Sequence, residues 1–226
     1  MSTVILRKRY GNYWFRVNEL IQPRTYLVDQ LMHRLGPQSV HAYWDWVIRH
    51  IAYPYGHPAW DDLHTEQAFW RPTFFGRTPK FLYRQADYWE FPGEVLRDRV
   101  GDCKDTAALL TSMLRHVLSD RQVYMSVGYY QDRGHRHLHA WTTIFLPNGT
   151  PLALDTTYKT PLPGTTWVTE APHYVPFWRA NDRRTRIIQP VMARQAYGAD
   201  LRLEASARSK TSFYTGTDAK GGARYG

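Results

Sequence analysis

Three residues of this chain have side chains that together could carry out nucleophilic chemistry on a carbonyl group: Cys103, His139 and Asp155. A thiolate can attack a carbonyl carbon, an imidazole can take and return the thiol proton, and a carboxylate can orient the imidazole. Cys103 is the single cysteine of the chain, and most lone cysteines are buried and inert. Whether this one is a nucleophile therefore depends on the elements that position it.

The run Gly101-Asp102-Cys103-Lys104-Asp105 has the pattern of a helix start. Asp102 is a good N-cap, and Asp105 corresponds to the acidic half of a capping box. Apolar residues at helical spacing follow, which predicts a helix with Cys103 at its first position. Unpaired backbone N–H groups and the positive end of the helix dipole favour a thiolate there. These local features alone do not decide whether Cys103 is a nucleophile or an inert structural cysteine.

His139 begins one predicted strand and Asp155 ends the next. A two-residue turn at Asn148-Gly149 would place the two side chains on opposite faces of the sheet. A three-residue loop, Pro147-Asn148-Gly149, pairs Asp155 with Trp141 and places it on the face of His139. The proline suits the first central position of a type I turn, and the glycine suits the left-handed position after it. We therefore predict the three-residue loop, with imidazole and carboxylate on one face.

The order Gly-Asp-Cys at a helix start, His-Ala-Trp on one strand and Leu-Asp on the next resembles the transglutaminase-like superfamily. Asp45 to Tyr53 is similar to the early helix of that domain. Tyr88 to Leu96 is similar to a segment of the bacterial transglutaminase-like cysteine proteases, and the resemblance spans roughly residues 40 to 160. It implies an α+β fold, with a helical N-terminal half that carries the cysteine and packs on an antiparallel sheet that carries His and Asp.

The resemblance implies a thiol-dependent acyl-transfer enzyme, nearest to a cysteine peptidase or amidase acting on protein through a thioester on Cys103, with His139 and Asp155 completing a triad. We expect no cofactor and no metal ion. The backbone N–H of Cys103 would be one oxyanion donor. The second would come from upstream of the cysteine, and the candidates are Tyr53, Trp70 and Gln85.

The chain divides into three predicted parts. Residues 1–37 form an N-terminal hairpin arm and a short helix, residues 38–190 the transglutaminase-like catalytic domain, and residues 191–226 a low-complexity basic tail. Within the catalytic domain, the stretch from Tyr53 to Lys80 is rich in proline, glycine and aromatic residues, and we expect a long ordered loop there.

Composition sets the broader limits. The chain has 226 residues and a formal net charge of +9. One cysteine excludes an internal disulfide framework. The sequence shows no signal peptide and no apolar run of the roughly 18 residues that a membrane span needs. We therefore expect a protein of the cytoplasm or of a macromolecular assembly, without a membrane partner.

Two other functions stay open. The first is a structural or assembly component, for example of a virion, that reuses this fold with or without activity. In that case a protein assembly would hold the basic N-terminal arm and the C-terminal tail. The second is a nucleic-acid-binding module, which rests on charge alone. A metal site at His135, His137 and His139 is also conceivable on one strand face. However, Gly134 and Arg136 indicate that the first two histidines belong to a polar loop.

Overall fold

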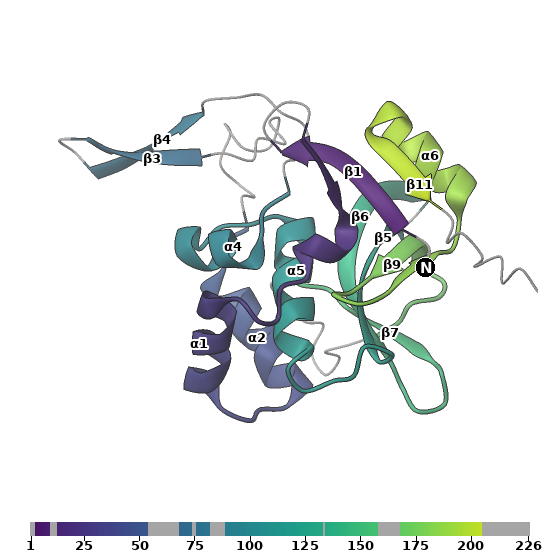
Figure 1. Ribbon diagram of the computed structural model, residues 1–226, viewed down its shortest axis with the longest axis horizontal. Helices are drawn as coiled ribbons and strands as arrows, with labels where there is room; N and C mark the ends of the chain where they lie inside the picture. Colours follow the sequence, from purple (N-terminus) through teal and green to yellow (C-terminus); the bar gives the residue numbers. More distant parts are fainter. Residues whose placement is uncertain are drawn as a thin grey trace, which may run out of the picture.

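The computed structural model describes residues 3–9, 13–53, 68–73, 76–81, 89–132, 134–157 and 168–204. Four α-helices form one side of the molecule, and α1, α2 and α4 gather on one side of α5 (Figure 1). Their bounds are α1 (Tyr26–Leu35), α2 (Val40–His50), α4 (Pro92–Asp98) and α5 (Cys103–Leu114). Ser39 caps α2 by accepting the N–H of Ala42 at 3.1 Å. None of the helices described is long and apolar enough to cross a membrane.

A six-stranded sheet covers the other side of α5 (Figure 1). Its strand order is β10-β9-β5-β6-β7-β8, and each neighbouring pair is antiparallel. The predicted mixture of helices with an antiparallel sheet is thus confirmed. The bounds are β5 (Val123–Asp132), β6 (His135–Phe145), β7 (Pro151–Leu154), β8 (Val168–Thr169), β9 (Tyr174–Ala180) and β10 (Thr185–Ile187).

Helix α5 is the centre of the fold, because it separates two hydrophobic clusters. Ala107 and Ala108, near its start, pack in a cluster with residues of β5, β6 and β9. Leu109 and Leu110 pack in a second cluster with α1, α2 and α4. Every residue of α5 after Cys103 is buried, whereas Cys103 itself is half-buried. The helix is therefore held by packing along its length, while its first residue reaches the surface.

The N-terminal arm is part of the same folded body. Strands β1 (Thr3–Arg9) and β2 (Tyr13–Arg16) form the expected hairpin, and the 3-10 helix η1 (Val17–Leu20) follows. Val4, Leu6 and Phe15 are almost completely buried in the cluster that contains the start of α5. The arm therefore contributes to the core that supports the cysteine helix.

The folded body extends past the predicted boundary at residue 190. Helix α6 (Pro190–Tyr197), the 3-10 helix η2 (Gly198–Asp200) and strand β11 (Leu201–Glu204) follow, and β11 pairs with β1 in a three-stranded sheet of order β11-β1-β2. Ala193 and Tyr197 are buried in the core, which gives this stretch the apolar contacts that its composition alone did not indicate. Residues 205–226 lie outside the described residues.

The second half of the stretch from Tyr53 to Lys80 is not the loop that the sequence predicts. Strands β3 (Ala68–Thr73) and β4 (Gly76–Phe81) form a two-stranded antiparallel hairpin. Aromatic and β-branched residues, which are enriched in strands, occur in both: Phe69, Trp70 and Thr73 in β3, and Thr78 and Phe81 in β4. Residues 54–67 lie outside the described residues.

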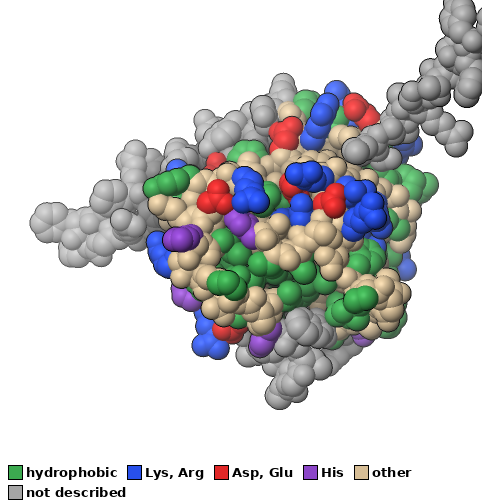
Figure 2. All heavy atoms as spheres, turned by 60° about the horizontal axis from the view of Figure 1, so that its bottom comes forward, with side chains coloured by type: hydrophobic (Ala, Val, Ile, Leu, Met, Phe, Trp, Pro, Cys, Tyr) green, Lys and Arg blue, Asp and Glu red, His purple; other side chains and the backbone are tan. Residues whose placement is uncertain are grey.

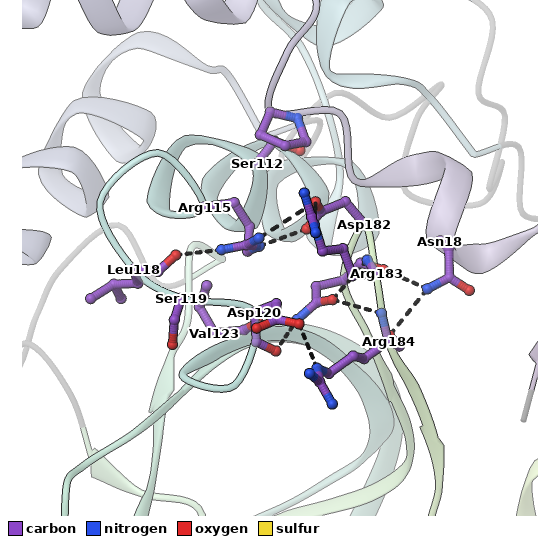
Figure 3. Close-up of polar contacts among 12 residues, drawn as sticks. Asn18, Ser112, Arg115, Leu118, Ser119, Asp120, Val123, Asp182, Arg183 and Arg184 are labelled. Carbon is purple, nitrogen blue, oxygen red and sulfur yellow. Dashed lines mark hydrogen bonds and ion pairs between the residues drawn. The ribbon is translucent and has the colours of Figure 1, made fainter. Parts of the chain in front are cut away.

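Polar contacts fix the end of α5 to the sheet (Figure 3). Arg115, directly after the helix, pairs with Asp182 in the turn between β9 and β10, with Nε and Oδ1 2.6 Å apart. Asn181 donates to the carbonyl oxygen of Asp120 at 2.8 Å, and Arg184 pairs with the Asp120 carboxylate at 2.6 Å. These contacts connect the turn before β5 with the turn after β9. They hold α5 in register with the strands that carry the candidate site.

Charged groups of both signs share the molecular surface. Figure 2 shows one face on which Lys and Arg side chains lie beside Asp and Glu side chains, with apolar side chains between them. Mixed charges of this kind are typical of a solvated surface, whereas a nucleic-acid groove presents a continuous basic field. On the face shown, the net charge of +9 is not concentrated in one such field.

Candidate active site

The start of α5 has the predicted capping geometry. The side chain of Asp102 accepts the N–H of Lys104 at 3.0 Å, and the side chain of Asp105 accepts the N–H of Asp102 at 3.2 Å. Both halves of a capping box are therefore present. Cys103 occupies the first helical position, where a backbone N–H has no partner within the helix. This N–H is a donor that an oxyanion at the thiol could use.

His139 and Asp155 meet in a buried contact. His139 Nε2 and Asp155 Oδ2 are 2.7 Å apart, and the two residues are 9% and 8% exposed. This is the distance of a charge-assisted hydrogen bond. Because Nε2 faces the carboxylate, Nδ1 is the ring nitrogen that remains for proton exchange with a thiol.

The hairpin between β6 and β7 sets this contact, and its register is the predicted one. Leu154 pairs with Thr142, so Asp155, the next residue, falls on the face of His139. Gly149 has a φ of +84°, and its N–H donates to the carbonyl oxygen of the residue three positions earlier at 2.8 Å. The three-residue loop with a left-handed glycine is thus confirmed.

Electrostatics couple the imidazole to both of its neighbours. Burial would lower the pKa of His139, but the negative charges of Asp155 and Cys103, and hydrogen bonds to both, raise that pKa well above its usual value. Burial would likewise raise the pKa of Asp155, but the charge of His139 and the hydrogen bonds to the carboxylate lower it. The site thus favours the protonated form of His139 beside an ionised Asp155.

The carboxylate of Asp155 is held by three donors. Oδ1 accepts the N–H of Thr157 at 2.8 Å, and Oδ2 accepts the hydroxyl of Tyr174 at 2.9 Å in addition to His139. The main-chain carbonyl of Asp155 accepts the indole N–H of Trp44 at 2.7 Å. Residues from α2, β6 and β9 therefore converge on this one aspartate.

Aromatic rings enclose the imidazole. The ring of Trp141 lies nearly parallel to that of His139, with 19° between the planes and 6.3 Å between the centroids. Trp141 Nε1 donates to Glu170 Oε1 at 3.0 Å, and Arg179 pairs with the same carboxylate. Glu170 is only 3% exposed. Because Arg179 holds this buried carboxylate, and the carboxylate accepts the indole N–H, the Trp141 ring is fixed beside the imidazole.

A second buried cluster of charged groups lies under the start of α5. Asp105 also accepts the N–H of Glu90 at 2.9 Å, and Lys104 forms an ion pair with Asp102. Burial, followed by the charge of Asp105, raises the pKa of Glu90 to about 9. Burial, followed by the charge of Asp102, raises the pKa of Asp105 to about 8. The cluster therefore holds protons at neutral pH, and the ammonium group of Lys104 partly balances its negative charge.

The three candidates for the second oxyanion donor have different positions. Tyr53 follows Ala52, whose N–H and C=O bond to Arg99 and Gly101 in a parallel bridge next to the cysteine loop. Trp70 lies in β3, and its side chain is outside the described residues, as is the whole of Gln85. The bridge brings Tyr53 into the neighbourhood of Cys103, and the role of all three residues stays a prediction.

His135 and His137 lie in β6 and not in a loop. Asp132 pairs with His135 and Tyr130 with His137, so the β5–β6 ladder continues almost to its turn at Gly134. Both histidines are exposed, and their ring centroids are 6.4 Å apart. Within the ranges that the structure describes, no group of three or more His, Cys, Asp or Glu side chains could hold a metal ion.

Sequence reasoning did not find Trp44, Glu170 or Tyr174. Helical spacing in α2 predicts an apolar face with Tyr43, Trp46, Val47 and His50. The helix buries Tyr43 and Val47 as expected, but Trp44 in place of Trp46 and His50. Neither Glu170 nor Tyr174 belongs to a motif, and each reaches the site only because β8 and β9 join the sheet. An expectation that a buried indole needs an acceptor could have drawn attention to Trp44 and Trp141.

Comparison with known proteins finds solved structures with a similar fold, among them the following two. Legionella pneumophila LapG is 16% identical over 78% of this chain and 83% of its own, with a TM-score of 0.46. A protein from Cytophaga hutchinsonii assigned to the cysteine proteases is 14% identical over 82% of this chain and 48% of its own, with a TM-score of 0.42. No family model matches the chain, and no curated protein does. This likeness concerns the fold, so the chain's own residues have to indicate its chemistry.

Proposed function

We propose that this chain is a thiol-dependent acyl-transfer enzyme, a cysteine peptidase or amidase, with Cys103 as nucleophile, His139 as base and Asp155 as its orienting group. The observation that supports this most is the position of His139. Its Nε2 bonds to a buried, fully hydrogen-bonded carboxylate at 2.7 Å, and the charge of Cys103 contributes to its raised pKa. A structural domain has no need for an imidazole between a thiol and a carboxylate.

The proposed reaction has two steps. The Cys103 thiol gives its proton to His139 Nδ1, and the sulfur attacks the substrate carbonyl carbon to form a tetrahedral intermediate. The Cys103 N–H donates to the oxyanion, and the imidazolium then protonates the leaving amine as the C–N bond breaks. Water, activated by His139, hydrolyses the resulting thioester and regenerates the thiol; an amine in place of water would give transfer.

Alkylation by iodoacetamide at about pH 6 tests the nucleophile directly, because the chain has a single cysteine. A thiolate–imidazolium pair should react on the order of 100-fold faster than the same cysteine in the urea-unfolded chain. His139→Gln should lower the rate toward the unfolded value, while Cys103→Ser should take up no label. A wild-type rate equal to that of the unfolded chain would refute the proposal and favour a structural use of the fold.

Reaction with p-nitrophenyl acetate tests both steps. The wild type should gain one acetyl group on Cys103 by mass spectrometry and release nitrophenolate in a burst. Faster turnover on addition of methylamine would indicate transfer, whereas turnover that does not respond to the amine would indicate hydrolysis. His139→Gln should abolish the burst without loss of the fold.

A further inference from the structure

Tyr174 shares the Asp155 oxygen that faces the imidazole. Its hydroxyl donates to Asp155 Oδ2 at 2.9 Å, and the same oxygen lies 2.7 Å from His139 Nε2. The other carboxylate oxygen accepts the N–H of Thr157 at 2.8 Å. Both oxygens are thus pinned by donors outside the proposed triad. Rotation of the carboxylate about its last bond would break one of these hydrogen bonds.

We propose that Tyr174 is a positioning residue of the acyl-transfer site, which acts through Asp155 and touches neither substrate nor thiol. The inference rests on the proposed function for its catalytic meaning. A buried carboxylate with a single side-chain donor would be costly to keep ionised, because it has lost its water. The phenol supplies a second side-chain donor to the ionised form, and it fixes which oxygen faces the imidazole.

The phenol is itself held in place before any substrate arrives. Tyr174 is 7% exposed and begins β9, where it pairs with Tyr130. Its ring packs against Trp141 and Tyr130, with centroids 5.0 and 5.1 Å away, and its N–H donates to the Glu170 carbonyl at 2.7 Å. Because these contacts already fix the Tyr174 residue, its hydroxyl can orient the Asp155 carboxylate at little further cost in conformational entropy.

The surroundings of Asp155 make this role testable. Among the described residues, the titratable side chains that interact with its carboxylate are His139 from β6 and Tyr174 from β9, while Cys103 of α5 interacts with the imidazole. Removal of the phenol oxygen should leave the substrate-binding surface unchanged. It should move the protonation of Asp155 to higher pH, because the ionised carboxylate loses a hydrogen bond that the protonated form needs less.

The experiment compares Tyr174→Phe with Tyr124→Phe. Tyr124 is a suitable control because it is fully buried on β5 and its hydroxyl has no hydrogen-bond partner among the residues that the structure describes. Two pH profiles are measured for each protein: the nitrogen-15 shifts of the His139 ring, assigned by their loss in His139→Gln, and the rate of Cys103 alkylation. Thermal unfolding shows whether each variant is folded.

In Tyr174→Phe, the change in the His139 nitrogen-15 shifts that accompanies protonation of Asp155 at low pH, the acidic step, should move up by about one pH unit. The fall in the Cys103 alkylation rate at low pH should move by the same amount. Tyr124→Phe should reproduce both wild-type profiles. An unchanged acidic step in folded Tyr174→Phe would overturn the inference, whatever the alkylation rate is. Conversely, slow alkylation of the wild type would refute the proposed function, while a shifted step would still show that Tyr174 controls Asp155.

Discussion

The indole of Trp44 donates to the main-chain carbonyl oxygen of Asp155 at 2.7 Å. This hydrogen bond joins the second helix of the chain to the residue that follows strand β7. The Asp155 side chain faces His139, while its backbone is fixed from the helical side. The helical half of the protein thus contributes more to the site than the cysteine helix alone.

Trp44→Phe should therefore destabilise the protein beyond the loss of its packing. The substitution keeps an aromatic ring but leaves the buried carbonyl of Asp155 without its donor, a cost of about 1–3 kcal/mol. Urea unfolding measures the change in the free energy of unfolding. Trp46→Phe is the matched control, because Trp46 is only partly buried, and a larger loss in the control than in Trp44→Phe would contradict this role.

Local patterns predicted the two elements that bear the proposed nucleophile and its partners. Asp102 and Asp105 are three residues apart, and their capping geometry follows from that spacing. The hairpin register follows from a proline and a glycine at fixed positions in one short loop. Both predictions succeed because the interactions that decide them lie within a few residues of each other along the chain.

Long-range contacts were not predictable in the same way. Tyr174 reaches Asp155 only because β9 pairs with β5. Glu170 reaches Trp141 only because β8, the strand directly before it, pairs with β7. Likewise, Ala193 is buried in the core because α6 lies against β9. No spacing in a single sequence encodes which distant strand becomes a neighbour, so these partners required the three-dimensional arrangement.

Gly128 should not tolerate a side chain. It pairs with His139 across β5 and β6, at a shift in the register between β5 and β9. A Cβ atom there would lie 2.0 Å from the carbonyl oxygen of Val175, which is backbone and cannot move aside alone. We expect Gly128→Ala to cost about 3 kcal/mol or more in urea unfolding.

Gly93→Ala is the contrasting substitution in this comparison. A Cβ at Gly93 in α4 would meet Leu27 Cδ1 at an ordinary 3.7 Å. Since alanine is the better helix former, the free energy of unfolding should stay level or rise by up to about 1 kcal/mol. Equal losses in the two variants would show that close approach of β9 is not what requires glycine at position 128.

Lys104→Met should destabilise the start of α5. The Lys104 side chain is 6% exposed and forms an ion pair with Asp102, and its charge also lowers the pKa of Asp105. Removal of the ammonium leaves the half-buried Asp102 carboxylate without its cation, which should cost about 3 kcal/mol. A double-mutant cycle with Asp102→Asn, which keeps an N-cap, measures the coupling by urea unfolding, and additive losses would refute the pair's importance.

Glu90→Gln should make stability less dependent on pH. The pKa of Glu90 is raised to about 9 in the folded protein, against about 4.3 in an unfolded chain. Between these values the folded state binds more protons than the unfolded state, so the contribution of Glu90 to stability is full below about pH 4 and falls as the pH rises toward 9. The free energy of unfolding of Glu90→Gln relative to wild type should therefore increase from pH 5 to pH 9. Glu19→Gln removes the same charge from an exposed side chain and should show no such trend; a difference that stays constant with pH in Glu90→Gln would mean that the carboxyl group is ionised in the folded protein.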